Sequence, residues 1–511
     1  MALLFRVFVF SLLSSSLALG REAPARPTSF KTVVRAAGLQ ADVAILRKAY
    51  EALHPGLLRY NNKAQMDAEF ERLRAQLDHD QSLQDAYLAF SFFAAKVRCG
   101  HTYANFFNQP KAVVAELFEG ENRVPFYFEW LGNQMIVTRD FTPGKQLPRG
   151  TQVLEINGTP ASALLARLIT ITRADGSNDA TRVAFLGVRG ESLYESFDIF
   201  FPMLFPQRST TIKLVVKEPG QSDTRGISVQ ALTFAERVAP IKSREAQRKG
   251  GDDVLFQWSY RADGSALLRM DNWALYDSKW DWKAWLNAKL DELVDRKAPA
   301  LLIDLRGNGG GLDVGDVILS RLIAKDLKPT ASARLVRYRR VPAELLPYLD
   351  TWDPSFKDWG DRAVELERPW PTAPSVHYFR QTITDDGTEG DVIRVEGKHF
   401  SGKVFVLVDA NNSSATFQFA QKVKKNGLGV LVGQPTCGNQ RGINGGAFFF
   451  LRLPKSKIEM DLPLVGYFPE AEMPDAGLTP DVLAPPTVED IVGGKDAALA
   501  AIEKLMRSSA Q

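Results

Sequence analysis

The sequence predicts a mixed α/β protein whose core is a largely parallel β-sheet. From about residue 252, short apolar strands alternate with segments of helical period, a pattern typical of βαβ units with a sheet buried on both faces. Two strands lead into loops of unusual composition, RGNGGG at 306–311 and NNSSA at 411–415. Functional residues gather at the carboxyl ends of parallel strands, so these loops are the first candidates for a site.

Length and composition limit the class of protein. The chain has 511 residues, of which 45% are hydrophobic and 24% charged, so we expect a globular protein of two or three domains. The formal net charge is +3 and no long basic run is present, which gives no electrostatic case for binding nucleic acid.

The first 20 residues differ from the rest of the chain. They contain one arginine, an apolar stretch and a small-x-small ending at Ala18-Leu19-Gly20, which predicts a cleaved secretory signal peptide at 1–20. We therefore expect a periplasmic or secreted protein with no membrane contact beyond this signal. No later segment is long and apolar enough to span a bilayer.

The half of the chain before the core divides into two parts. Residues 40–98 show helical period, so we expect an N-terminal helical domain at 21–120. Residues 121–215 carry short β-rich pieces, and VLEIN is followed by an Asn-Gly turn and a short helix. That order suits a small β-rich binding module.

The expected core, residues 250–490, reads as alternating strands and helices, with a C-terminal helix at 491–511. Between its glycine and serine loops lies 325–400, a stretch of little regular pattern that we interpret as a lid or substrate wall, or as plain surface. The expected strands are 265–273, 300–304, 404–408 and 428–433, and the helices 280–297, 313–325 and 413–427, the first with a core-type apolar stripe of Trp282, Trp285, Leu286, Leu290 and Leu293.

The glycine loop is suited to holding an oxyanion. Four glycines in six residues leave backbone N–H groups sterically free to point at a bound oxygen. The loop lacks the Lys-Ser/Thr pair of a phosphate-binding P-loop and the spacing of a dinucleotide fingerprint. Donors fixed in place before charge develops are what acyl transfer requires.

Ser413 and Ser414 stand at the start of a predicted helix, where two roles are open. Serine is a favoured helix N-cap, and the same position favours negative charge, as a nucleophile requires. A nucleophile also needs a base. The sequence CGHTYANFF places His101 just past a helix among aromatic residues, whereas the other four histidines have less distinctive surroundings.

Taken together, three blocks resemble the tail-specific or C-terminal-processing serine peptidases and their tricorn-core relatives. They are LIDLRGNGGG at 302–311, VLVDANNSSATFQFA at 406–420 and VGQPTCGN at 432–439, within a resemblance that covers 265–482. LPRGTQVLEING at 147–158 resembles the PDZ-like module often inserted in this family. The resemblance implies a ClpP/crotonase-like catalytic core, with a PDZ-like module at 121–215.

The resemblance assigns roles to the two loops. It makes Ser414 the nucleophile, with Ser413 in the cap position. The oxyanion donors become the backbone N–H groups of Ala415 and of Gly311, with Gly310 beside it.

The chain departs from the Ser-Lys branch of the family. Asn439 stands where that branch has its lysine base, so the Ser-Lys dyad is absent. The tricorn type uses histidine, and Cys99-Gly100-His101-Thr102 corresponds to the Asp-Gly-His-Thr of many relatives. The resemblance therefore makes His101 the general base, and it leaves Asn439 to bind substrate or to hold its loop.

The resemblance also implies an acid and a disulfide. A glutamate downstream of the serine orients the histidine in the tricorn type, and among Glu470, Glu472 and Asp475 we favour Glu472, exposed loop carboxylates being the alternative. Cys99 and Cys437 each lie two residues before a site position, which predicts a Cys99–Cys437 disulfide, or else two separate buried thiols.

The predicted function is that of an exported serine-type peptidase that forms an acyl-enzyme on Ser414. It requires no metal or organic cofactor and acts on a peptide or protein substrate. The main alternative is a non-catalytic binding protein for apolar ligands or peptides on the same fold, as in the interphotoreceptor retinoid-binding repeats. An esterase with the same nucleophile is a third possibility.

Overall fold

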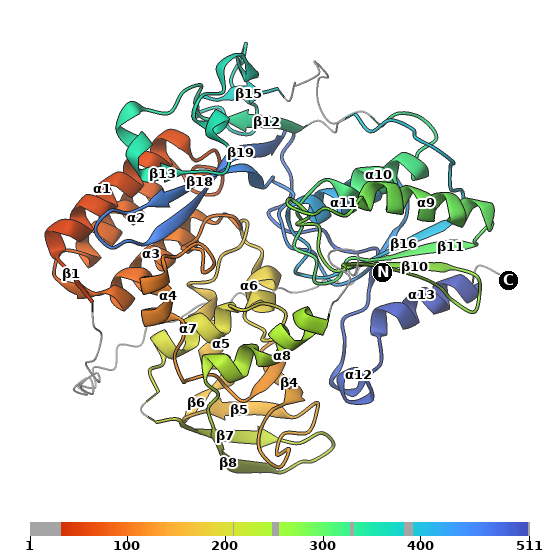
Figure 1. The fold of residues 1–511 in the computed structure, drawn as a ribbon, viewed down its shortest axis with the longest axis horizontal. Helices are drawn as coiled ribbons and strands as arrows, with labels where there is room; N and C mark the ends of the chain where they lie inside the picture. The colour runs from red at the N-terminus through yellow and green to blue at the C-terminus, as the bar shows by residue number, and fades with distance from the viewer. Residues whose placement is uncertain (1–31, 208, 248–254, 328–331, 383–391, 509–511) are drawn as a thin grey trace, which may run out of the picture.

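The structure is a computed structural model that describes residues 32–207, 209–247, 255–327, 332–382 and 392–508. The predicted signal peptide lies outside these residues. Three six-stranded sheets and one two-stranded sheet are formed within them, and helices surround the sheets (Figure 1). The mixed α/β class predicted from the sequence is confirmed.

The first large sheet is the predicted core sheet. Its strand order is β20-β17-β16-β11-β10-β9, and every pairing is parallel except that of β9 with β10. β11 and β16 are neighbours, so the loops that follow them meet at one edge of the sheet. The strands are β9 (Phe256–Tyr260), β10 (Ala266–Met270), β11 (Ala300–Asp304), β16 (Lys403–Val408), β17 (Val430–Gly433) and β20 (Val482–Leu483).

Helices cover both faces of this sheet, which is why β11 is buried along its whole length (Figure 1). α9 (Trp282–Asp295), α10 (Val314–Leu322) and α11 (Ser414–Lys425) pack on one face. α13 (Ala497–Ser508) packs its Ala498 and Ile502 on the other and follows the short α12 (Val488–Gly493).

The second sheet corrects the interpretation of residues 325–400 as an irregular connection. This stretch supplies β12 to β15, which join β18 and β19 in the order β13-β18-β19-β12-β15-β14. Strands of two to five residues are too short to give a period in the sequence. The strands are β12 (Ser332–Val336), β13 (Leu349–Asp350), β14 (Ala363–Glu365), β15 (Phe379–Gln381), β18 (Asn444–Arg452) and β19 (Glu459–Pro469), with 3₁₀ turns η2 (Ala343–Tyr348), η3 (Pro354–Lys357) and η4 (Gly360–Arg362).

The N-terminal region is helical, as predicted. Asn62 begins α2 with a reciprocal capping box, and Ser82 begins α3 by accepting a hydrogen bond from a backbone N–H, so the sequence defines both starts. The elements are β1 (Val33–Val34), α1 (Ala36–Leu53), α2 (Lys63–Gln76), β2 (Gln81–Ser82), α3 (Leu83–Val97) and α4 (Lys111–Leu117).

The third sheet is the β-rich part that follows. The predicted turn at Asn157-Gly158 joins β5 to β6, and both residues adopt positive φ angles of 50° and 79°. The strands are β3 (Phe126–Leu131), β4 (Gln134–Asp140), β5 (Gln152–Ile156), β6 (Thr159–Pro160), β7 (Thr211–Lys217) and β8 (Thr224–Gln230), and the helices α5 (Ala161–Ile169), α6 (Asp179–Phe185), α7 (Ser196–Leu204) and α8 (Phe234–Gln247).

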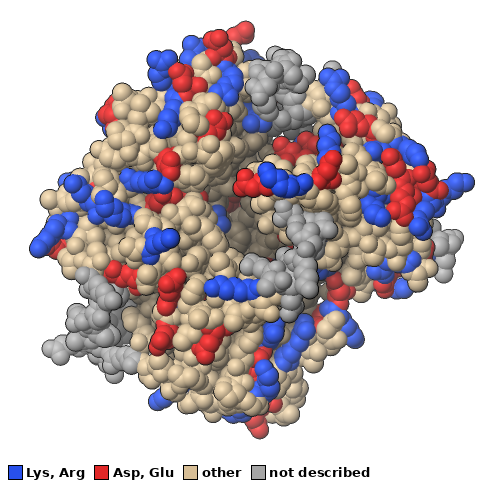
Figure 2. Space-filling view, viewed as in Figure 1, with Lys and Arg blue, Asp and Glu red and all other residues tan. Residues whose placement is uncertain are grey.

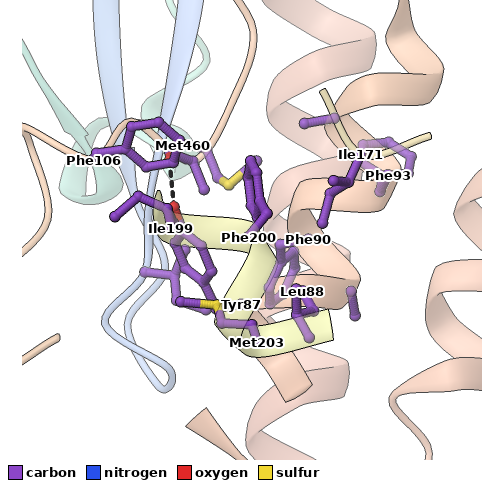
Figure 3. Packing of buried hydrophobic residues seen from close by; sticks show 14 of the residues in the cluster. Tyr87, Leu88, Phe90, Phe93, Phe106, Ile171, Ile199, Phe200, Met203 and Met460 are labelled. Carbon is purple, nitrogen blue, oxygen red and sulfur yellow. Dashed lines mark hydrogen bonds between the residues drawn. The ribbon is translucent and has the colours of Figure 1, made fainter. Parts of the chain in front are cut away.

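One hydrophobic cluster joins the N-terminal helices to the second and third sheets. Figure 3 shows Tyr87 of α3, Phe200 of α7 and Met460 of β19 meeting in this cluster. The Tyr87 hydroxyl donates to the Ala104 carbonyl at 2.7 Å, which anchors the segment after α3. This segment carries His101, so the hydrophobic cluster shared by the N-terminal helices and the two sheets supports it.

Positive and negative side chains are spread over the whole face drawn in Figure 2, and a hollow opens near the middle of that face. Within the described residues, no helix combines the length and the apolar character needed to cross a bilayer.

Candidate active site

The glycine loop and the serine turn are bonded to each other by two buried asparagines. The Asn412 side chain donates to the carbonyls of Leu305 and, at 3.1 Å, Asn308. The Asn308 side chain donates to the Met270 carbonyl at 2.9 Å and accepts the Gly310 N–H at 2.9 Å. The ends of β10, β11 and β16 are thereby fixed relative to one another.

Asp409 makes a second connection between the same two loops. Its carboxylate accepts the Gly307 N–H at 3.1 Å and the Asn411 N–H at 2.9 Å. Arg189, between α6 and α7, reaches this carboxylate at 3.7 Å and Glu129 of β3 at 3.5 Å. A residue beside the third sheet thus touches the turn that presents Ser414.

Ser414 is the first residue of α11 and has a backbone φ of 50°, in the left-handed region that costs a serine energy. Ser413 occupies the N-cap position, as expected, but its side chain makes no capping hydrogen bond. Thr416 and Phe417 both donate their N–H groups to the Ser413 carbonyl. The Ala415 N–H has no acceptor among the described residues and is free to bind an anion.

Gly310 lies directly against the serine. A Cβ at this glycine would stand 2.8 Å from both the Ser413 carbonyl oxygen and the Ser414 Cβ, and 3.0 Å from the Ala415 nitrogen. Gly310 gives its own N–H to Asn308, so it is not an oxyanion donor in this arrangement. The N–H of Gly311 has no acceptor in the part of the chain described, which makes Gly311 the better candidate.

His101 lies in the segment between α3 and α4, beside β18. Its ring packs against Phe448 with centroids 5.8 Å apart, and its Nε2 would lie 4.0 Å from a Cβ on Gly445. Burial, together with the nearby Arg173 guanidinium, lowers its pKa from about 6.5 to about 4, so the ring is neutral at physiological pH. Within the described residues its buried Nδ1 has no partner, and no hydrogen bond joins the ring to Ser414.

His54, one of the four histidines with less distinctive surroundings in the sequence, supports the same segment. It is fully buried, its Nδ1 accepts the Gly56 N–H at 3.0 Å, and its Nε2 lies 2.8 Å from the Thr102 hydroxyl. Burial is the main cause that lowers its pKa to about 3. A neutral histidine therefore fixes the residue next to His101.

Glu472, the predicted acid, is exposed, and within the described residues His101 has no carboxylate partner. Asn439 is fully buried, and its amide donates to Asp475 at 2.7 Å and to the Asp175 carbonyl at 3.1 Å. These bonds hold the loop of Asn439, one of its two predicted roles, and the other, substrate binding, stays a prediction.

The predicted Cys99–Cys437 disulfide is wrong in this structure, where both cysteines are buried free thiols. Both thiols are enclosed in the packed interior, each at 1% exposure, and Cys99 already has a partner, because it accepts from the Asn444 amide at 3.1 Å. Burial raises the pKa of the Cys99 thiol to about 11.

A cavity of about 540 Å³ follows the exposed face of α11. Gln418, Gln421 and Lys425 line it, and they succeed Ser414 at the four- and three-residue intervals of one helix face. Asp313, two residues after Gly311, lies on its wall as well. Among the described residues, no cluster of histidine, cysteine or acidic side chains is placed to hold a metal ion.

Comparison with known proteins identifies the core. Residues 264–482 match the family model described as peptidase family S41. The structure of mature CPAF complexed with lactacystin is similar, with a TM-score of 0.61 and 16% identity over 93% of this chain and 98% of that one. Mature CPAF alone gives a TM-score of 0.58 and 15% identity over 89% and 94%. At such identities the likeness shows a common fold.

Among curated proteins, no sequence matches this chain significantly. The three sequence blocks and the family model agree on the same segment, and the fold of most of the chain is similar to that of mature CPAF. The core at residues 264–482 therefore belongs to peptidase family S41, the tail-specific peptidases.

Proposed function

We propose that the protein is an exported serine-type peptidase that hydrolyses peptide bonds through an acyl-enzyme on Ser414. One observation carries the proposal. Ser414 is held at a φ of 50° at the start of α11, against Gly310 and beside an Ala415 N–H that has no acceptor in the described structure. A strained nucleophile next to unpaired backbone donors is the arrangement that acyl transfer needs.

In the proposed reaction, the Ser414 hydroxyl attacks the carbonyl carbon of the scissile bond. His101 takes the hydroxyl proton and later returns it to the leaving amine. A pKa of about 4 keeps His101 neutral and able to accept that proton, although it makes the ring a weaker base. The N–H groups of Ala415 and Gly311 donate to the oxyanion of the tetrahedral intermediate.

We also propose how the remaining parts serve this reaction. The core is ClpP/crotonase-like, and the β-rich part at 121–215 acts as a PDZ-like module. The cavity along α11 receives side chains of a peptide or protein substrate, because it runs along the helix face that Gln418 and Gln421 share with Ser414. Residues 1–20 direct export and are then removed, which cell fractionation and N-terminal sequencing of the mature chain would test.

A non-catalytic binding protein is the second candidate. It is favoured by the absence of a hydrogen bond between His101 and Ser414 among the described residues, and by Asn439 at the lysine position. Catalytic hydrogen bonds are often loose without substrate, so this observation carries less weight than the geometry of Ser414.

Fluorophosphonate labelling of the purified protein separates the two candidates. We expect the wild type to label, Ser414→Ala not to label, and Ser413→Ala, the matched control on the adjacent hydroxyl, to label. His101→Ala should slow labelling by about two to four orders of magnitude. A wild type that stays unlabelled, while folded by circular dichroism, would exclude the peptidase and leave the binding protein.

A further inference from the structure

The four residues Asp175–Asn178, here called the strap, lie between α5 and α6 and contact three separate segments around the candidate site. These segments are 98–100, which leads into His101, 436–439, and the turn at Asp475. The sequence around the strap, ADGSND, carries no family motif, and nothing in its pattern pointed to the site.

The strap holds the segment before His101 by three hydrogen bonds. The Gly100 N–H donates to the Asp175 carboxylate at 2.9 Å, the Gly176 N–H donates to the Arg98 carbonyl at 2.9 Å, and the Arg98 guanidinium donates to the Ser177 hydroxyl. Asp175 is fully buried, and its second carboxylate oxygen has no partner within the described residues. Gly100 allows this close contact, because a Cβ would stand 2.6 Å from that oxygen and the Asp175 side chain would have to shift.

The strap holds the segment 436–439 by three more bonds. The Asn178 amide donates to the carbonyls of Thr436 and Gly438, at 2.9 and 2.8 Å. The Asn439 amide donates to the Asp175 carbonyl at 3.1 Å. Cys437 lies between the two carbonyls that Asn178 binds, and the neighbouring Gly438 packs on α11, where a Cβ would stand 2.5 Å from the ring of Phe417, three residues after Ser414.

Asp475 closes the arrangement from the far side. Its carboxylate accepts the Ser177 N–H at 2.8 Å and the Ser177 hydroxyl at 2.9 Å. The Arg98 guanidinium reaches it at 3.0 Å and the Asn439 amide at 2.7 Å. Arg98, Asn439 and the strap therefore share one carboxylate, which ties the two site-bearing segments to each other.

We propose that Asp175 and Asn178 are positioning residues that set the placement of His101 relative to Ser414. The inference rests on the proposed Ser414–His101 chemistry. One end of the strap bonds to the residue before His101, and the other bonds on both sides of Cys437, in the segment that packs on Phe417 of α11. In this proposal the Asp175 carboxylate, by fixing the backbone before His101, orients the histidine, which is the role that the resemblance implied for Glu472. A displacement of about 1 Å between base and nucleophile is enough to cost about a hundredfold in rate.

Asn178→Asp is the sharpest variant for testing this inference. The Asn178 Oδ1 caps α6 by accepting the Thr181 N–H, and aspartate keeps that acceptor. The change removes both donors and places a carboxylate against the two carbonyls. Asn178→Ser keeps a capping oxygen and removes the donors without adding charge, so it serves if Asn178→Asp fails to fold. Asn62→Asp, at the exposed N-cap of α2, is the matched control.

The readout is the second-order rate constant for fluorophosphonate labelling, measured in wild-type and His101→Ala backgrounds. We expect Asn178→Asp to slow labelling about ten- to hundredfold in the wild-type background and to add no further loss in His101→Ala. Asn62→Asp should label at the wild-type rate. Peptide hydrolysis should show the loss in kcat, with KM within about twofold.

The outcomes separate the two ideas. Equal losses in both backgrounds would mean that the strap stabilises the fold without acting through His101, which overturns the inference. If His101→Ala slows labelling but Asn178→Asp does not, the inference is also overturned. A wild type that does not label overturns the proposed function, and the inference falls with it.

Discussion

Ser414 and the glycine loop stand on neighbouring strands of one sheet, whereas His101 stands on a segment held by side chains from distant parts of the chain. The β11–β16 pairing places the ends of both strands in register, and Asn308 and Asn412 then bond the two loops together. No comparable strand pairing fixes His101. Its neighbour Gly100 depends on Asp175, some 75 positions further along the chain.

We call the glycine loop with Ser414 the nucleophile half of the proposed site, and the segment of His101 the base half. The difference indicates that the nucleophile half is rigid and that the base half can be adjusted. A loop fixed by backbone pairing in a buried sheet moves only if the sheet moves. A segment fixed by a few side-chain hydrogen bonds moves when one partner is lost. We therefore expect changes near Ser414 to abolish reactivity and changes near His101 to reduce it by degrees.

The comparison predicts its largest effect at a pair of glycines, one in each half. Gly310→Ala places a methyl group 2.8 Å from the Ser414 Cβ at a φ of 101°, where alanine is also strained. We expect labelling to fall about a thousandfold, as for loss of an oxyanion donor. Gly100→Ala meets the Asp175 side chain at 2.6 Å, and because that side chain can shift, we expect a loss of about tenfold.

Labelling rates and melting temperatures of the two variants provide the measurement. Gly158→Ala, at a glycine with an open surrounding in the β5–β6 turn and a φ of 79°, controls for strain alone. Equal losses in Gly310→Ala and Gly100→Ala would contradict the contrast between the two halves.

The second prediction concerns pH and the base half. With a pKa lowered to about 4, His101 stays neutral and able to act as a base well below its ordinary value near 6.5. We expect the labelling rate to be flat from pH 8 to about 5 and to fall about tenfold per unit below pH 4. A midpoint near pH 6.5 would show that His101 is solvated or is not the base.

Unfolding has to be measured over the same range. His54 titrates near pH 3 in the folded protein and near 6.5 when unfolded, so the unfolded chain binds the extra proton between these values. The stability that the neutral histidine contributes is complete above pH 6.5 and is lost as the pH falls toward 3. At pH 5 this loss is roughly 2 kcal/mol, and rates are compared only where the protein remains folded.

The sequence allowed the meeting of the glycine loop and the serine loop at one sheet edge to be predicted, because its signals are local. An apolar run before RGNGGG, another before NNSSA and helical period after each are enough to bring the two loops to one sheet edge. The family match over 264–482 agrees with that interpretation. What stayed hidden is the role of Asp409 and the two asparagines, since short polar residues in a loop look alike until their partners are known.

The base half was harder because its contacts join positions far apart. His101 stood out by its neighbours, but Asp175 and Asn178 lie in a turn between two short helices, where Asp and Asn are common for local reasons. The same distance explains the cysteine error. Cys99 and Cys437 do belong to connected segments, yet sequence spacing could not reveal that each is a separate buried thiol and that Asn444 bonds to the Cys99 sulfur.

The third prediction tests whether the rigid half has any adjustable contact. Arg189 is the residue to change, because it reaches Asp409 at 3.7 Å from outside the core and leaves about a fifth of its side chain exposed, 22%. Long, partly solvated ion pairs contribute little, so we expect Arg189→Gln to lower kcat by about fivefold or less, with KM unchanged. Arg225→Gln, which breaks the surface pair with Glu218 on the third sheet, should leave kcat as it is. A loss as large as that of Gly310→Ala would mean that the serine turn is not rigid.

The smallest expected effect separates binding from chemistry in the rigid half. Gln421 lines the cavity along α11 and lies two helical turns from Ser414, so Gln421→Trp fills space without touching the reacting atoms. We expect KM for a peptide to rise about threefold, with labelling by a small fluorophosphonate unchanged, because the small probe does not extend into the cavity. Gln84→Trp, a partly buried position on α3, is the control for the bulk of the new side chain. If kcat falls and KM does not, the cavity is coupled to the placement of Ser414 and is not a substrate pocket.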